Sequence, residues 1–247
     1  MKNKKQLSFI AIAFVSITGG INSYAQSNAD MFGLAPQGEE TSNAQKNAGN
    51  VFVPLNYNSR AFGYNANAGV IPKGPFSFYL NTPPLFISLA DQSAQNFIAG
   101  ASWANNKWYG VVYSDNQLVT LDTITGARTV VGPMAPSGTE TWTGMSYDKA
   151  AGIMYAVSVT GTGSQSTIYT VNLATGTATP VGVATGVAFI CLAANNAGNL
   201  FAVDILGDNF GSVNKTTGAW TLIGAIGFNA SFAQDMEFDM STDTCVF

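Results

Sequence analysis

The chain has 247 residues, of which 47% are hydrophobic and only 10% are charged, with a formal net charge of −4. This length suits one large all-β domain or two small ones, and the apolar content is enough for a sizeable core. A chain with few lysine and arginine side chains and no basic cluster is a poor nucleic-acid binder, because phosphate contacts need positive charge.

The first 25 residues are predicted to be a secretory signal peptide. A basic start, MKNKK, is followed by an apolar run over residues 7–17, and small residues stand at Ser23 and Ala25 before the expected cut. The run is too short to span a bilayer as a helix, and no later run is long enough; an uncleaved anchor is the alternative. Cleavage lowers the basic count from 10 to 7 against 14 acidic side chains. We therefore expect an acidic, extracellular or cell-surface protein without a membrane span.

A repeat follows a polar, aperiodic stretch over residues 26–50, which we interpret as a flexible leader. Aligned on Gly100, Gly144, Cys191 and Asp235, the repeat units are 44, 47 and 44 residues apart. Each unit has four strand-sized pieces separated by turn signals, as in WTGMSYD, IMYAVSV, STIYTVNL and ATPVGV. Four short strands in a repeat of about 40 to 50 residues are typical of a β-propeller blade.

The sequence thus predicts an all-β fold, a β-propeller of four-stranded antiparallel blades. The second strands, such as WYGVVY and LFAVDI, are continuous apolar runs, which favours burial on both faces between neighbouring blades. The expected full repeats are at about 97–141, 142–188 and 189–233, with partial ones at 51–96 and 234–247.

The partial units leave the closure of the ring open. In the first of them, residues 80–81 and 87–89 resemble third and fourth strands. Three full and two partial blades can pool their strands into a closed four-bladed ring. A fragment of a larger propeller is the interpretation we favour, because nothing marks Phe247 as a natural end.

A phrase with a central Thr-Gly pair closes every full repeat: LVTLDTITGARTVVG, IYTVNLATGTATPVG and FGSVNKTTGAWTLIG. Its Asp or Asn can accept backbone N–H bonds within a turn, and its Gly falls where a hairpin loop requires a positive φ. We therefore assign a structural role to six turn residues: Asp122, Gly126, Asn172, Gly176, Asn214 and Gly218. A strand rather than a helix follows the Gly, which excludes a phosphate loop, and the loop has too few carboxylates for calcium. No cofactor and no metal are expected.

Several phrases, among them GASWANNKWYGVVY, WTGMSYD, LFAVDILGD and AQDMEFD, resemble those of secreted β-propeller repeat proteins from Bacteroidetes over residues 60–247. In proteins of this kind the propeller is commonly followed by fibronectin-type or adhesin-like domains and a C-terminal sorting signal for type IX secretion. The resemblance implies a cell-surface or extracellular place within a larger, adhesin-like protein. It implies no established catalytic residues.

Strand parity divides the loops between two faces. The turns after the first strands share one face with the Thr-Gly turns, which follow the third strands. The longer, more varied loops lie on the other face. Varied loops on a rigid scaffold are where binding usually occurs. The candidate binding residues on that second face are Glu140, Trp142, Asp204, Asp208, Asn209, Phe232 and Asp235.

Catalysis has little support in the sequence. The chain has no histidine, which removes the commonest general base and the commonest metal ligand. Asp235, Glu237 and Asp239 alternate and would share one face of a strand, as a glycosidase carboxylate pair requires, but they have no identifiable partner. We assign no catalytic residue. Cys191 and Cys245 can form one disulfide in an oxidising compartment, although two separate buried thiols fit their apolar strands better.

These observations predict a secreted, non-catalytic module for binding or scaffolding, with an unknown protein or glycan as its ligand. One alternative is an accessory domain of a secreted peptidase or glycan-degrading enzyme whose catalytic domain is missing from these residues. Another is a carbohydrate-binding propeller that uses Trp142 and loop aromatics.

Overall fold

The computed structural model describes residues 60–67, 71–79, 86–230, 234–239 and 243–246. The expected signal peptide, the leader and Phe232 lie outside these ranges. Within them the regular structure consists of strands. None of the described residues forms a helix that is long and apolar enough to cross a membrane.

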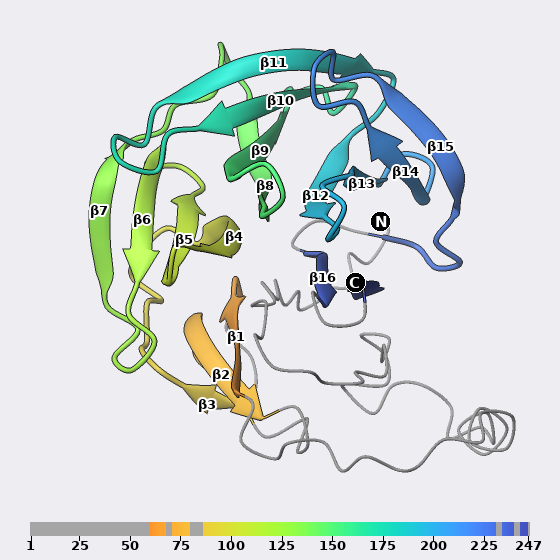
Figure 1. The fold of residues 1–247 in the computed structure, drawn as a ribbon. Helices are drawn as coiled ribbons and strands as arrows, with labels where there is room; N and C mark the ends of the chain where they lie inside the picture. Colours follow the sequence, from red (N-terminus) through yellow and green to blue (C-terminus); the bar gives the residue numbers. More distant parts are fainter. Residues whose placement is uncertain (1–59, 68–70, 80–85, 231–233, 240–242, 247) are drawn as a thin grey trace, which may run out of the picture.

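Three four-stranded antiparallel sheets follow the three full repeats, and each keeps its strands in chain order. The first full blade contains β4 (Ile98–Ala104), β5 (Lys107–Val112), β6 (Gln117–Leu121) and β7 (Arg128–Pro133). The second contains β8 (Thr141–Asp148), β9 (Ile153–Val159), β10 (Gln165–Val171) and β11 (Ala178–Thr185). The third contains β12 (Phe189–Ala194), β13 (Leu200–Asp204), β14 (Asn209–Val213) and β15 (Trp220–Ala225). The blades are arranged in a ring (Figure 1), which confirms the predicted β-propeller.

Two smaller sheets stand beside the full blades. One has the order β1-β2-β3, formed by Arg60–Asn65, Gly74–Tyr79 and Ile87–Ser88, and the other pairs β16 (Glu237–Asp239) with β17 (Thr244–Val246). Residues 87–89 were expected to form a fourth strand, and Ile87–Ser88 lies at the edge of this sheet, where it pairs with β2 as the third of the described strands. The aromatic-rich segments RAFGYN and GPFSFY, which had no assigned strand, pair with each other as the first two. Residues 80–81 lie outside the described ranges.

The first strand of each blade is innermost and the fourth lies at the rim (Figure 1). Around the centre, β4 contacts β8, β8 contacts β12, and β12 contacts β16. The hydrophobic core lies between blades, since each of four buried clusters combines side chains of two neighbouring sheets. The second strands β5, β9 and β13 are almost entirely buried, as expected for strands covered on both faces.

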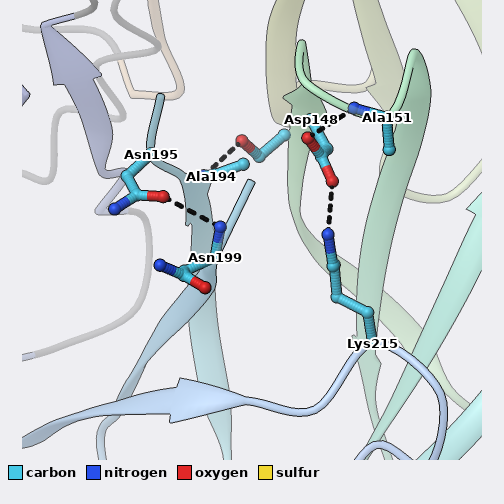
Figure 2. Close-up of polar contacts among 7 residues, drawn as sticks. Asp148, Ala151, Ala194, Asn195, Asn199 and Lys215 are labelled. Carbon is cyan, nitrogen blue, oxygen red and sulfur yellow. Dashed lines mark hydrogen bonds and ion pairs between the residues drawn. The ribbon is translucent and has the colours of Figure 1, made fainter. Parts of the chain in front are cut away.

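Polar contacts join neighbouring blades near the centre. Two serines occupy equivalent positions on β4 and β8, and each accepts a backbone N–H from the next inner strand. The N–H of Tyr147 donates to Oγ of Ser102 at 3.0 Å, and that of Ala194 donates to Oγ of Ser146 at 3.0 Å. Between the second and third full blades, Nζ of Lys215 also pairs with the fully buried carboxylate of Asp148 at 2.7 Å (Figure 2).

At the rim, each turn formed by the Thr-Gly phrase, here called a T–G turn, rests on the blade before it. A Cβ added at Gly176, in the turn of the second full blade, would lie 2.8 Å from the carbonyl oxygen of Gly132 on β7. A Cβ added at Gly218, in the turn of the third, would lie 2.8 Å from the carbonyl oxygen of Gly182 on β11. The first full blade's turn rests in the same way on the β1–β3 sheet, where Nε2 of Gln92 donates to the carbonyl oxygen of Gly126 at 2.8 Å.

This contact corrects the interpretation of the last Gly in the repeated phrase. That Gly does more than end the rim strand, because it leaves room for the backbone of the neighbouring turn. A Cβ added at Gly132 or Gly182 would overlap the carbonyl oxygen of Thr175 or Thr217, respectively. Only glycine permits so close an approach of two backbones.

Candidate functional site

The T–G turns share one hydrogen-bond pattern. In the first, Oδ1 of Asp122 accepts the N–H of Ile124 at 2.9 Å and of Thr125 at 2.6 Å, while the N–H of Gly126 donates to the carbonyl of Asp122 at 2.8 Å. Gly126 has a φ of +70°. The Thr125 and Ile124 N–H bonds lower the pKa of the Asp122 carboxyl. These side-chain oxygens are therefore used within the turn itself.

The other two turns repeat this pattern with asparagine. Oδ1 of Asn172 accepts the N–H of Ala174 at 2.8 Å, and Oδ1 of Asn214 accepts the N–H of Thr216 at 2.9 Å. Gly176 and Gly218 have φ values of +81° and +72°. An Asp or Asn at this position is therefore a turn residue in all three blades.

Glu140, a candidate on the opposite face, is held by three hydroxyl groups. Its Oε2 accepts hydrogen bonds from Ser158 and Tyr169, both at 2.6 Å, and its Oε1 accepts one from Thr167 at 2.7 Å. The Tyr169 hydroxyl in turn accepts the N–H of Ser137 at 2.9 Å. The carboxylate thus ties the loop before β8 to β9 and β10 of the same blade.

Replacing Glu140 with alanine is expected to lower the free energy of unfolding by about 2 kcal/mol, because several hydrogen bonds to a charged group are lost together. Urea unfolding measures this change, with Thr139→Ala as the control, since Thr139 is exposed on the same loop. Equal unfolding midpoints for the two variants would mean that Glu140 does not fasten the loop.

Trp142 requires a correction. It was expected to be an exposed aromatic beside a varied loop, yet it lies in β8 and is 0% exposed. Its Nε1–H donates to the carbonyl of Met134 at 2.7 Å, and its ring meets that of Tyr169 edge-on at 4.9 Å. Because both the ring and its N–H are used between the first two full blades, this indole does not face solvent.

The third full blade uses its candidate residues to order loops. Asp204, buried at the end of β13, accepts the N–H of Ala188 on Oδ1 at 2.7 Å and that of Gly207 on Oδ2 at 3.2 Å. Asp208, with a φ of +52°, accepts the N–H of Ala230 on Oδ1 at 2.8 Å. Asn209 begins β14 and is half-buried. Asp204 and Asp208 thus fix the backbone of this face.

Glu237 lies near the centre of the ring, and Asp235 lies in the irregular segment just before its strand. Both are buried, and Glu237 is on the innermost strand β16. Oδ1 of Asp235 accepts the N–H of Met236 at 2.9 Å, and Oε1 of Glu237 accepts that of Phe238 at 3.1 Å. Oε2 of Glu237 also lies 3.5 Å from Oγ of Ser102 on β4. Sequence reasoning missed Ser102, because nothing in the amino-acid sequence indicates which strands meet across the centre of the ring.

Burial raises the pKa of Glu237 to about 8 and that of Asp235 well above its ordinary range. Among the described residues the one ion pair is Lys215–Asp148, so no cation there offsets this cost. The Glu237 carboxyl therefore keeps its proton at neutral pH. The side chain of Asp239 is not among those that the structure describes. The expectation that three alternating carboxylates share one face of a strand can therefore be compared with the structure only for Asp235 and Glu237.

The two cysteines, for which a disulfide had been left open, are free thiols. Cys191 is buried and Cys245 is half-buried, and both belong to the cluster between the third full blade and the β16–β17 sheet. Over the described ranges, no three histidine, cysteine, aspartate or glutamate side chains gather in a way that could hold a metal ion.

A pocket of about 260 Å³ lies on the face of the T–G turns, on the first full blade. It is formed between the β4–β5 turn and the T–G turn of that blade. Two indoles, a cation, a carboxylate and polar groups meet there, from Trp103, Trp108, Lys107, Asp122, Asn106 and Thr123. The ring of Trp103 is half-buried, while Trp108 is 1% exposed. The buried Nε1–H of Trp108 has no hydrogen-bond partner.

The side chains of this pocket differ from those at the same place in the second full blade. At the positions of Lys107 and Thr123, the second full blade has Ile153 and Leu173, which pack against apolar clusters between blades. Sequence reasoning assigned this face a structural role and missed the pocket, because its residues come from two separate turns. The signal was present in the comparison of the repeats, since the first full blade has polar side chains where the second has apolar ones, although the third also has polar ones there, Asn199 and Lys215.

No family model and no curated protein matches the sequence, but solved structures do. One is a structural genomics protein of unknown function from Bacteroides thetaiotaomicron, with 12% identity and a TM-score of 0.52, over 74% of this chain and 52% of that chain. A chain of a nidogen/laminin complex matches with 10% identity and a TM-score of 0.52, over 73% and 65%. A catalytically inactive virginiamycin B lyase from Staphylococcus aureus matches with 12% identity and a TM-score of 0.47, over 73% and 57%.

At these identities the likeness is one of fold alone. The chain spans about half to two thirds of the length of these three structures. The Bacteroides thetaiotaomicron structure supports the Bacteroidetes resemblance at the level of the propeller fold.

Proposed function

We propose that the chain is a secreted or cell-surface, non-catalytic binding module, and that it binds a small, neutral saccharide in the pocket of the first full blade. The observation that carries the proposal is the composition of that pocket. Indole rings stand there beside side chains that donate and accept hydrogen bonds. A sugar ring presents both an apolar C–H face and a rim of hydroxyl groups, so it needs this combination.

The individual groups fit separate parts of such a ligand. The half-buried ring of Trp103 offers an apolar face to the C–H groups of a sugar. Lys107 and Asn106 can donate hydrogen bonds to hydroxyl oxygens, and Thr123 can both donate and accept. A volume of about 260 Å³ lies just below the range of drug-sized ligands, which suits a single sugar ring.

The absence of histidine from the sequence supports a binding role rather than catalysis, because it removes the commonest general base. Placement outside the cell follows from the expected signal peptide and from the Bacteroidetes resemblance. Attachment to adhesin-like domains and export by a type IX route are part of the same proposal.

A glycan array followed by calorimetric titration tests the site. We expect saturable binding of at least one saccharide, and a loss of affinity of about tenfold or more in Trp103→Ala, equivalent to about 1.4 kcal/mol. The matched control is Tyr147→Ala, since Tyr147 occupies the position of Trp103 in the second full blade and lies outside the pocket.

Silence across the array, or equal affinities for wild type and Trp103→Ala, would contradict the saccharide site. A hydrolase activity that disappears in Glu237→Gln would instead contradict the non-catalytic role.

A further inference from the structure

The rim strand of the third full blade lacks a contact that the other two full blades have. Gly132 on β7 and Gly182 on β11 each receive the T–G turn of the following blade. A Cβ added at either would come within 2.8 Å of the neighbouring turn's backbone. Gly224 occupies the same position on β15, and a Cβ added there would meet none of the described residues within 4 Å.

The positions next to the rim glycine are also more exposed in the third full blade than in the other two. Just before the glycine, Val131 and Val181 are half-buried, whereas Ile223 is 58% exposed. Two residues after it, Met134 and Ala184 are 0% and 5% exposed.

In the third full blade the residue two positions after the rim glycine is Ile226, and it is only half-buried. The side chains of β15 are nevertheless as apolar as those of β7 and β11, the two rim strands that a T–G turn covers. A solvent-facing strand does not need a large aliphatic residue at Ile223, and clustered exposed apolar groups on a soluble protein usually indicate an interaction surface.

We propose that β15 is a docking surface for a further blade of the same repeat, and that the group it receives is a β-hairpin ending in a T–G turn. The two covered rim strands define how such a hairpin sits. The Thr carbonyl and the Gly of the turn lie over the rim glycine, as Thr175 and Gly176 do over Gly132.

The three T–G turns of the described residues are all already docked. Those of the second and third full blades rest on Gly132 and Gly182. That of the first rests on the β1–β3 sheet, where a Cβ added at Gly126 would lie 2.7 Å from Pro75. The hairpin that covers β15 must therefore come from another segment of polypeptide.

A backbone-cyclised peptide with residues 165–185, which contains β10, its T–G turn and β11, tests the proposal. Cyclisation is needed because an isolated hairpin is marginally stable in water. Added to the full chain, the labelled peptide is expected to bind saturably by fluorescence anisotropy. It should also slow hydrogen exchange of the backbone amides of residues 220–226.

Gly224→Val is the decisive variant. It should keep the thermal unfolding midpoint of the wild type, because its side chain enters open space, yet reduce peptide binding tenfold or more, because that side chain fills the place of the turn. Gly161→Val is the matched control: Gly161 also faces open space, but on the β9–β10 loop, and this variant is expected to bind the peptide normally. A peptide carrying Gly176→Val, at a position with a φ of +81°, should lose the turn and fail to bind.

Three outcomes would overturn the proposal. The first is that the wild-type chain does not bind the peptide. The second is that Gly224→Val binds as tightly as wild type, or that Gly161→Val weakens binding equally. The third is that β15 holds a second copy of the chain, which sedimentation would reveal as a dimer that Gly224→Val dissociates.

Discussion

Gly182→Val is expected to lower the free energy of unfolding by about 3 kcal/mol, or to prevent folding altogether. The added side chain would overlap the carbonyl oxygen of Thr217 and lie within 2.6 Å of the amide nitrogen of Gly218 at its Cβ. Both are backbone atoms of a turn fixed by its own hydrogen bonds, so relief requires the third full blade to move away from the second. Overpacking of a site that cannot yield costs this much.

The repeat supplies a matched control for this change. Gly224→Val makes the same substitution at the equivalent position of the next blade, where the structure leaves open space. It is expected to alter stability by no more than about 0.5 kcal/mol, as exposed substitutions usually do. Urea unfolding of the two variants gives the difference directly. If both unfold at the same urea concentration, then the contact between rim glycine and T–G turn does not hold the blades together.

The second large effect is a loss of stability as the pH rises from about 5 to 8. Burial raises the pKa of Glu237 from its ordinary 4.5 to about 8 in the folded chain. Below pH 4.5 the carboxyl is protonated in both states, and it does not oppose folding. Between pH 4.5 and 8 it ionises in the unfolded chain only, which favours unfolding by up to about 1.4 kcal/mol per pH unit. Above pH 8 both states are ionised, and the dependence disappears.

Glu237→Gln removes this contribution while keeping the side chain's size and its hydrogen-bonding oxygen. The difference in unfolding free energy between wild type and variant should therefore grow in favour of the variant from pH 5 to pH 8, measured by urea unfolding at each pH. Asp235, whose pKa burial also raises, keeps a similar slope in the variant. A difference that stays constant with pH would show that Glu237 is already ionised in the folded chain.

The fold was accessible from the sequence because its causes are local and repeated. Apolar second strands, Asp or Asn at the turn entrance and Gly at the positive-φ position recur in three units, so each unit supports the interpretation of the others. The alignment on Gly100, Gly144 and Cys191 also holds in space, since a Cβ added at Gly144 would lie 2.8 Å from Cα of Cys191 on the next inner strand.

What the sequence could not predict depends on contacts between blades. Trp142 follows the polar text APSGTET, and only the packing of β8 against the first blade shows that its ring is buried. The raised pKa of Glu237 depends on the strands that enclose β16 rather than on its own neighbours in sequence. The pocket beside Trp103 requires two turns to meet, and the role of Gly182 requires the next blade's turn to be in place.

The contact at the rim also gives the ring a direction. In every pair the turn belongs to the later blade and the accepting surface to the earlier one, so the blades overlap in one order along the chain. During synthesis the accepting surface therefore emerges first. Each new blade can then dock on the blade before it, so the ring can assemble from the amino-terminal side while the chain is being made. Unravelling is expected to run in the opposite sense, because each turn must leave the earlier blade before that blade is free to open.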